Sequence, residues 1–301
     1  MWLDPVLRAA DGSGVKILHG LNAGPTAAGM AVAEGEWRDG SWGEVVRVPG
    51  GDVHVLDEGV LLGEGSFGYG VDDLGYLMSL MIVYGGLRDV DVRPGEVVLV
   101  APATGSFGGV AVHVVLALGA RVIAMGRNES VLEELVEGAR KGYPQGKVTG
   151  LGMAGDVEGN LDGVKKAARE LGAREGAVDV YFDMSPPNAS KSPHIKAGIA
   201  ALRAGGRMSL MGGAAGDVGF PYYQIMVKGL RLQGSWMFTP GQVDEVIRLV
   251  ETGILKLGEG TGVKCLGVFG LEEWEEAFRV AGDEGRVGRY VLFAPSGKGA
   301  E

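Results

Sequence analysis

The sequence predicts an α/β protein built on a doubly wound parallel sheet. From about residue 76 onwards, strand-length apolar runs alternate with segments whose apolar residues recur at helical spacing. Runs such as Val97–Val100 are continuously apolar, which is typical of strands covered on both faces. Short connections between alternating strands and helices favour right-handed crossovers, and therefore a parallel sheet with helices on both sides.

The pattern assigns the elements in order. We expect strands at 97–102, 121–125, 147–151, 178–183, 206–211 and 230–235, with helices at 108–118, 129–141, 160–172, 192–204, 221–228 and 241–252. A further helix is predicted over 73–90, before the first strand. At the other end we expect a strand at 263–269, a helix at 271–280 and a last strand in RYVLFAP. The stretch Trp42–Leu62 indicates short strands broken by a Pro-Gly-Gly turn.

Composition excludes several classes of function. The chain has 301 residues, of which 46% are hydrophobic, and a net charge of −10 without a basic cluster, so nucleic acid and anionic membrane are unfavourable partners. Its single cysteine, Cys265, allows neither an internal disulfide nor a thiolate metal cluster. We find no secretory signal pattern and no membrane-spanning apolar run. We expect a soluble, cytoplasmic protein that acts on a small molecule.

A glycine-rich turn follows the first strand of the alternating region. It reads Thr104, Gly105, Ser106, Phe107 and Gly108, a dinucleotide-binding fingerprint with alanine in its first glycine position. Gly105 would let the backbone approach a pyrophosphate, and Gly108 would let the helix pack closely on the strand. The amide groups at the helix start would meet the phosphate charge. The strand-turn-helix-strand context favours this function over a turn that serves packing alone.

The second strand ends in Gly126, Arg127 and Asn128. An NAD-binding unit usually has a carboxylate here that binds the ribose hydroxyls, and this chain has none. Arg127 instead offers a guanidinium to a 2′-phosphate, and Asn128 offers a neutral donor. We therefore expect NADP(H) rather than NAD(H). The alternative is that Arg127 is a solvated surface arginine without a role in binding.

Four segments in order resemble the medium-chain dehydrogenase/reductase superfamily, especially its zinc-independent quinone oxidoreductase-like members. They are VRPGEVVLVAPATGSFGGVAVHVVLALGARVIAMGRN, AGIAALRAGGRMSLMGG, LRLQGSWMF and FGLEEWEEAFRVAGDEGRVGRYVLF. The resemblance implies a Rossmann dinucleotide-binding domain over 76–261. It also implies a reduced GroES-like, β-rich catalytic domain formed by 1–75 together with 262–301.

Two departures from the family pattern bear on chemistry. Zinc-dependent members have Cys, His and acidic ligands near the N-terminus, whereas the four histidines here, His19, His54, His113 and His194, have no ligand spacing. We expect no catalytic zinc. The family also implies roughly sixty more residues before the WGEVVRVP strand, and these residues form one wall of the active-site cleft. The first forty residues or a partner would have to replace that wall.

The resemblance implies further site residues at the carboxyl edge of the sheet. Ser185 and Pro186 would lie beside the cofactor, and so would Gly212, Gly213, Ala214 and Ser235. Tyr84 is the candidate catalytic hydrogen-bond donor, with a core aromatic as its alternative role. The candidate substrate-binding residues are Tyr222, Tyr223, Trp236 and Phe238. Family members often dimerise through the strand that resembles LRLQGSWMF, so a homodimer is expected.

These expectations lead to one principal function and two alternatives. The principal one is a zinc-independent, NADPH-dependent oxidoreductase that reduces an apolar carbonyl, enone or quinone-like substrate. A chain without zinc or an obvious acid could instead template a cyclisation or rearrangement in specialised (secondary) metabolism. It could also be a nucleotide-binding partner subunit without catalysis of its own. The sequence leaves all three open.

Overall fold

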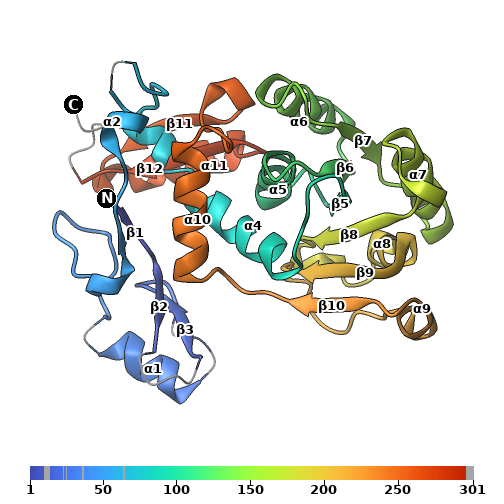
Figure 1. Cartoon of the computed structure of the whole chain (residues 1–301). Coiled ribbons are helices and arrows are strands. Elements are labelled where there is room, and N and C mark those ends of the chain that lie inside the picture. Colours follow the sequence, from blue (N-terminus) through green and yellow to red (C-terminus); the bar gives the residue numbers. More distant parts are fainter. Residues whose placement is uncertain (10–13, 23, 25, 36, 64, 296–301) are drawn as a thin grey trace.

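A six-stranded parallel sheet forms the centre of the protein (Figure 1). We describe it from a computed structural model that covers residues 1–9, 14–22, 24, 26–35, 37–63 and 65–295. The strand order is β10-β9-β8-β5-β6-β7, and this confirms the predicted Rossmann-type α/β fold. The strands are β5 (Val97–Ala101), β6 (Arg121–Gly126), β7 (Val148–Gly152), β8 (Val178–Asp183), β9 (Leu202–Leu210) and β10 (Arg231–Gly234).

Helices cover both faces of this sheet (Figure 1). One layer contains α5 (Ser106–Ala117), α6 (Glu129–Gly142) and α4 (Leu77–Asp89), with α10 (Pro240–Glu251) packed on α4. The opposite layer contains α7 (Val157–Glu170) and α8 (Pro193–Ala201), and α9 (Tyr222–Lys228) lies at the β10 edge. The helix predicted over 192–204 ends at 201, because the chain already enters β9 at Leu202.

Side-chain caps explain where several helices begin. Asn128 accepts a hydrogen bond from the Val131 amide at the start of α6, and Asp156 accepts one from Gly159 at the start of α7. Thr239 and Gln242 form a reciprocal capping box at the start of α10. These caps satisfy amide groups that have no partner inside the helix. The helix boundaries therefore agree closely with the sequence pattern.

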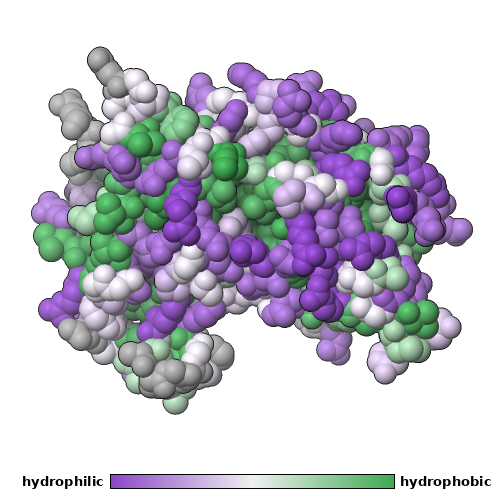
Figure 2. Space-filling model, viewed as in Figure 1, coloured by the Kyte–Doolittle hydropathy of each residue, from purple (hydrophilic) through white to green (hydrophobic). Residues whose placement is uncertain are grey.

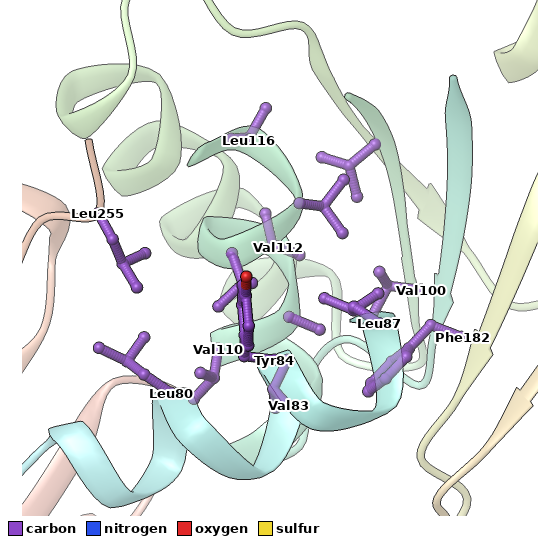
Figure 3. Close-up of a cluster of buried hydrophobic side chains, with 14 of the residues drawn as sticks. Leu80, Val83, Tyr84, Leu87, Val100, Val110, Val112, Leu116, Phe182 and Leu255 are labelled. Atoms are coloured by element: carbon purple, nitrogen blue, oxygen red, sulfur yellow. The ribbon is translucent and has the colours of Figure 1, made fainter. Parts of the chain in front are cut away.

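The larger core cluster lies between the sheet and the α4–α5 layer (Figure 3). Val100 and Phe182 contribute from neighbouring strands, and both are fully buried. A second cluster on the other sheet face packs β-strand residues against α7 and α8. Because both faces are covered by apolar layers, the central strands read as continuous apolar runs.

Short elements flank the central sheet at both ends of the chain. The N-terminal ones are β1 (Trp2–Leu3), β2 (Val6–Arg8), β3 (Lys16–Leu18), α1 (Ala27–Glu34), β4 (Val53–His54), α2 (Glu58–Leu61) and α3 (Val71–Leu74). The C-terminal ones are β11 (Lys264–Phe269), α11 (Trp274–Glu284) and β12 (Arg289–Phe293). Single 3₁₀ turns occur at Gly50–Asp52, Arg174–Gly176, Pro187–Ala189, Glu259–Thr261 and Leu271–Glu273. Within the described residues, no helix is long and apolar enough to cross a membrane.

The prediction of several strands over 42–62 was wrong in detail. The one strand in that stretch is the two-residue β4, which pairs with β1; the 3₁₀ turn Gly50–Asp52 precedes it and helix α2 follows it. Asp57 caps α2 by accepting a hydrogen bond from the Val60 amide, so the apolar run that follows becomes helical. The proposed division into a GroES-like part and a Rossmann part remains a prediction.

Polar contacts attach the N-terminal elements to the region after β10. The Arg8 guanidinium donates to the carbonyl oxygen of Phe238 at 2.9 Å and pairs with buried Asp4 at 2.6 Å. On α10, Asp244 lies 2.8 Å from Nδ1 of His54. These contacts fix the N-terminal elements against the loop that runs from β10 to α10 (Figure 1).

Buried His113 makes the stability of the fold sensitive to acid. His113 is a residue of α5 whose buried ring lies 6.0 Å from that of Tyr143, and burial lowers its pKa from 6.5 to about 4. Between pH 6.5 and pH 4 this histidine is protonated in the unfolded chain but neutral in the folded protein. Its effect on the free energy of unfolding is therefore negligible above pH 6.5, and the protein loses stability as the pH decreases towards 4. We expect this histidine alone to cost about 2 kcal/mol of unfolding free energy at pH 5.

Urea unfolding at pH 7 and pH 5 measures this loss. The His113→Leu variant lacks the titrating group, so its stability should fall less than that of the parent protein over the same interval. Equal losses in the two proteins would contradict the assignment.

Candidate functional site: a cleft at the carboxyl edge of the sheet

A cleft of about 500 Å³ opens at the carboxyl ends of the central strands. This is the edge at which open α/β sheets bind ligands. It is lined by Ile82, Pro102, Thr104, Gly105, Ser106, Phe107, Gly108, Arg127, Met184, Ser185, Pro186, Met211, Gly212, Gly213, Ser235, Trp236 and Met237. The structure therefore brings together most of the predicted cofactor residues from five separate loops.

The glycine-rich turn forms the floor of this cleft. Helix α5 begins at Ser106 directly after Gly105, and no side chain caps its first amide groups. A Cβ atom built on Gly105 would meet no atom within 4 Å, whereas one on Gly108 would lie 2.0 Å from the carbonyl oxygen of Pro102. Gly105 thus keeps the cleft open above the helix start, and Gly108 lets α5 approach the strand. Together they leave uncapped amide groups facing a space large enough for a phosphate.

Arg127 lies at the adenosine end that the resemblance implies, directly after β6. Within the described part of the chain, its side chain has no hydrogen-bond or salt-bridge partner, although it lines the cleft. Gly126 does not line the cleft, and it serves packing, because a Cβ there would lie 2.4 Å from the methyl group of Thr104. Asn128 also does not line the cleft, and its side-chain oxygen Oδ1 caps α6 by accepting from the Val131 amide. The structure thus leaves Arg127 as the available cation at this end.

The opposite wall comes from the loops after β8, β9 and β10. Ser185 and Pro186 follow β8, and Gly212 and Gly213 follow β9. Ala214, one residue further, does not line the cleft. The Ser235 hydroxyl lines it but donates to Asp89 at 2.8 Å, which links the β10 loop to the end of α4. Of these loops, the one after β10 also reaches the N-terminal elements, because Trp236 lines both this cleft and a cavity beside Lys16.

Tyr84 does not line the cleft. Its ring lies in the core beside Val110, between α4 and α5 (Figure 3), and its hydroxyl donates to Glu245 at 2.6 Å. Burial is the main cause that raises its pKa to about 12, and the contact with Glu245 adds to the shift. Arg88, also on α4, forms a salt bridge with the same Glu245 carboxylate at 3.0 Å. The position corresponds to the alternative role of a core aromatic, and we give Tyr84 no part in the reaction.

The predicted substrate residues lie in different places. Trp236 lines the cleft and also a second cavity of about 650 Å³, whose other lining residues are Gly14, Val15, Lys16, Asn22, Gly24 and Thr26. Phe238 is buried against Trp2 and Arg8. Tyr222 and Tyr223 are 82% and 71% exposed on α9 and line neither space. Of the four, only Trp236 lines either space, and the role of all four in substrate binding remains a prediction.

Sequence reasoning missed several apolar residues of the cleft. Met184 directly follows the strand predicted at 178–183, so the rule that found Ser185 would also have found it. Met211 was predicted as the last residue of the strand 206–211, but β9 ends at Leu210, which places Met211 in the loop. Ile82 comes from α4 and Met237 from the loop after β10. No local signal marks these two, because their position depends on how α4 packs against β9 and α10.

A metal centre does not fit the described part of the chain. No group of three or more His, Cys, Asp or Glu side chains there is arranged to hold a metal ion. We therefore derive no step through zinc, and the expectation of a zinc-independent protein remains a prediction.

Comparisons with known proteins agree with this architecture. Residues 107–252 match a family model described as zinc-binding dehydrogenase. An alcohol dehydrogenase of Rhizobium meliloti is 27% identical over 177 residues, which are 59% of this chain and 46% of that protein. An alcohol dehydrogenase 1 of Neurospora crassa is 25% identical over 218 residues, covering 72% of this chain and 55% of that one. The chain thus spans about half the length of the curated relatives it matches.

Solved structures show the same fold. The E. coli short chain alcohol dehydrogenase in complex with NADH superposes with a TM-score of 0.69 at 16% identity, covering 97% of this chain and 75% of the other. The Thermus thermophilus quinone oxidoreductase, solved also with NADPH, gives a TM-score of 0.57 at 24% identity and covers 83% and 72%. The chain therefore shares the fold of these dehydrogenases and is similar in sequence to zinc-binding dehydrogenases over residues 107–252.

Proposed function

We propose that this protein is a zinc-independent, NADPH-dependent oxidoreductase of an apolar carbonyl, enone or quinone-like substrate. The observation that carries the proposal is the pairing of an open glycine-rich helix start with Arg127, a cation that lines the same cleft and has no anionic partner in the described residues. The NADPH complex of the Thermus thermophilus relative supports a nicotinamide cofactor, and the NADH complex of the E. coli relative makes the choice between the two a question for experiment.

The cleft residues fit such a cofactor in a defined order. The amides at the start of α5 would hold its pyrophosphate, and Arg127 would pair with the 2′-phosphate. At the other end, Ile82, Met211 and Met237 present apolar surface suited to a nicotinamide ring. When bound, NADPH supplies a hydride, and the protein contributes orientation and exclusion of water.

Trp236 indicates where the substrate would bind. Its indole forms part of the cofactor cleft and part of the neighbouring 650 Å³ cavity, so it is the shared wall of the two spaces. An apolar substrate could stack on this ring while its reacting carbon faces the cofactor. Arg127 is the only charged side chain that lines the cleft within the described residues. We therefore propose that the proton for the developing oxygen comes from water rather than from an acidic side chain.

Turnover assays test this function directly. NADPH oxidation is followed at 340 nm with a panel that pairs 1,2-naphthoquinone and an α,β-unsaturated ketone with simple alkanals. We expect NADPH oxidation with the quinone and the unsaturated ketone. In Trp236→Ala, we expect the KM for these acceptors to rise at least about tenfold, the equivalent of one lost aromatic contact. Trp274→Ala, which removes an exposed ring on α11, serves as the matched control.

One alternative is favoured by a specific observation. The described lining of the cleft contains no His, Asp, Glu or Tyr, so the site would also suit a chain that binds nucleotide without transferring hydride. A non-redox cyclase or a silent partner subunit would bind NADPH without oxidising it in the presence of any acceptor. The same titration and turnover experiments therefore separate these alternatives from the oxidoreductase.

We also propose that two copies associate through the β10 edge. β10 is the last strand of the sheet, and the neighbouring α9 exposes Tyr222, Tyr223, Met226 and Val227 (Figure 2). An unpaired edge beside apolar surface favours pairing across a two-fold axis. Light scattering at micromolar concentration should give twice the mass of one chain, and Tyr223→Glu should shift the protein towards the monomer. A monomeric parent protein would contradict the proposal.

A further inference from the structure

A chain of buried polar side chains lies directly behind the β8 wall of the cleft. It connects Asp183 at the end of β8, Ser185 in the following loop and His194 on α8, each at most 4% exposed. The Ser185 hydroxyl lies 2.6 Å from Oδ1 of Asp183 and 2.9 Å from Nε2 of His194. Such groups are costly to bury unless every one has a partner, and here each of the three has one.

The partners determine the direction of each hydrogen bond. Oδ1 of Asp183 accepts from the Tyr181 hydroxyl at 2.9 Å and from the Ser185 hydroxyl. With Asp183 ionised, the single hydroxyl hydrogen of Ser185 is used in that bond, so Nε2 of His194 is the donor to Ser185. Nδ1 of His194 then accepts from the Ser192 hydroxyl at 2.6 Å. Burial, followed by the nearby Arg127 charge, lowers the pKa of His194 to about 4, which agrees with a neutral ring.

Ser185 is also the point at which two walls of the cleft meet. Its carbonyl oxygen accepts a hydrogen bond from the Gly213 amide at 2.8 Å. Gly212 approaches so closely that a Cβ there would lie 2.5 Å from the Ser185 nitrogen and 2.6 Å from its oxygen. A displacement of Ser185 would therefore move the loops after β8 and β9 together, and both loops line the cleft.

We propose that His194 is a positioning residue for the cofactor: its Nε2–H group holds Ser185, and thereby the Ser185–Pro186 and Gly212–Gly213 walls, in the binding conformation beside Arg127. His194 itself does not line the cleft, so it acts through Ser185. This inference rests on the proposed cofactor function, and it names a determinant that lies outside the glycine-rich turn and the arginine.

Two amide substitutions distinguish the contribution of Nε2, which contacts Ser185, from that of Nδ1, which contacts Ser192. His194→Gln can place its amide nitrogen near the position of Nε2 and keep the donor to Ser185. His194→Asn is shorter and can keep only the contact towards Ser192. We expect the asparagine variant to raise the NADPH dissociation constant by about tenfold, as for one lost buried hydrogen bond. The glutamine variant should remain within about threefold of the parent protein, and Ser190→Ala, in the same loop but outside the chain of bonds, is the control.

A second measurement does not depend on cofactor binding. Hydrogen exchange of the peptides that contain Met184–Pro187 and Met211–Gly213 reports the hydrogen bond between Gly213 and Ser185. These peptides should exchange faster in His194→Asn than in His194→Gln or the parent protein, without cofactor. If the parent protein binds neither NADPH nor NADH, the proposed function fails while the exchange comparison still decides the role of His194. Equal exchange in the two variants, or equal affinity, would overturn the inference.

Discussion

Replacing Gly105 with alanine is expected to weaken NADPH binding more than tenfold without changing the melting temperature. A Cβ at this position meets no atom within 4 Å, and the backbone there has φ −90° and ψ 165°, which alanine adopts freely. The folded protein therefore tolerates the methyl group. The group would occupy the space above the start of α5, where a pyrophosphate must approach the amides, so we expect a loss of about 1.5 kcal/mol or more of binding free energy.

Gly108→Ala is the matched variant with a different expected result. Its Cβ would lie 2.0 Å from the carbonyl oxygen of Pro102 and 2.9 Å from Cα of Ala103, so helix α5 must move away from the strand. We expect losses in both melting temperature and NADPH affinity, with a destabilisation of about 1–3 kcal/mol. Thermal unfolding and fluorescence titration of both variants measure the two effects. If Gly105→Ala binds NADPH as tightly as the parent protein, the turn does not hold the pyrophosphate.

Replacing Arg127 with alanine has the second large expected effect. Its guanidinium lines the cleft without a partner in the described residues, so a 2′-phosphate would gain a charge-assisted contact. We expect the dissociation constant of NADPH to rise by about 10- to 100-fold, while that of NADH changes by less than about threefold. The ratio of the two constants is the measurement, because it cancels any general damage to the cleft.

A matched control shows whether charge alone is responsible. Arg279→Ala removes one arginine from α11, where the side chain pairs with Glu276 and Asp283 away from the cleft. This variant should bind both cofactors as the parent protein does. Equal losses of NADPH and NADH affinity in Arg127→Ala would mean that the arginine supports the cleft without recognising a 2′-phosphate.

The central fold was predictable because its signals are local. Continuous apolar runs marked β5 and β6, and apolar residues at helical spacing marked α6 and α10. The region before Val71 was less predictable. Its two-residue strands β1 and β4 are paired across fifty residues, and so short a pairing leaves no period in the sequence.

The candidate site likewise contains residues that local sequence signals reveal and residues whose position depends on contacts between distant parts of the chain. Residues that follow strands, such as Thr104, Arg127 and Ser185, could be found because parallel strands bring their carboxyl ends to one edge. The orientation of Tyr84 could not, because it depends on Glu245, which lies 161 positions away in the chain. The contact between His194 and Ser185, on which our proposal rests, could not be predicted for the same reason: in the sequence His194 is one of four scattered histidines, and only the fold brings it to Ser185.

Calorimetric titration of the unmodified chain with NADPH and with NADH tests the central claim most directly. Our account predicts that one NADPH binds per chain, at least about tenfold more tightly than NADH, because only NADPH supplies the 2′-phosphate that pairs with Arg127. Tighter binding of NADH, or no binding of either cofactor, would contradict it.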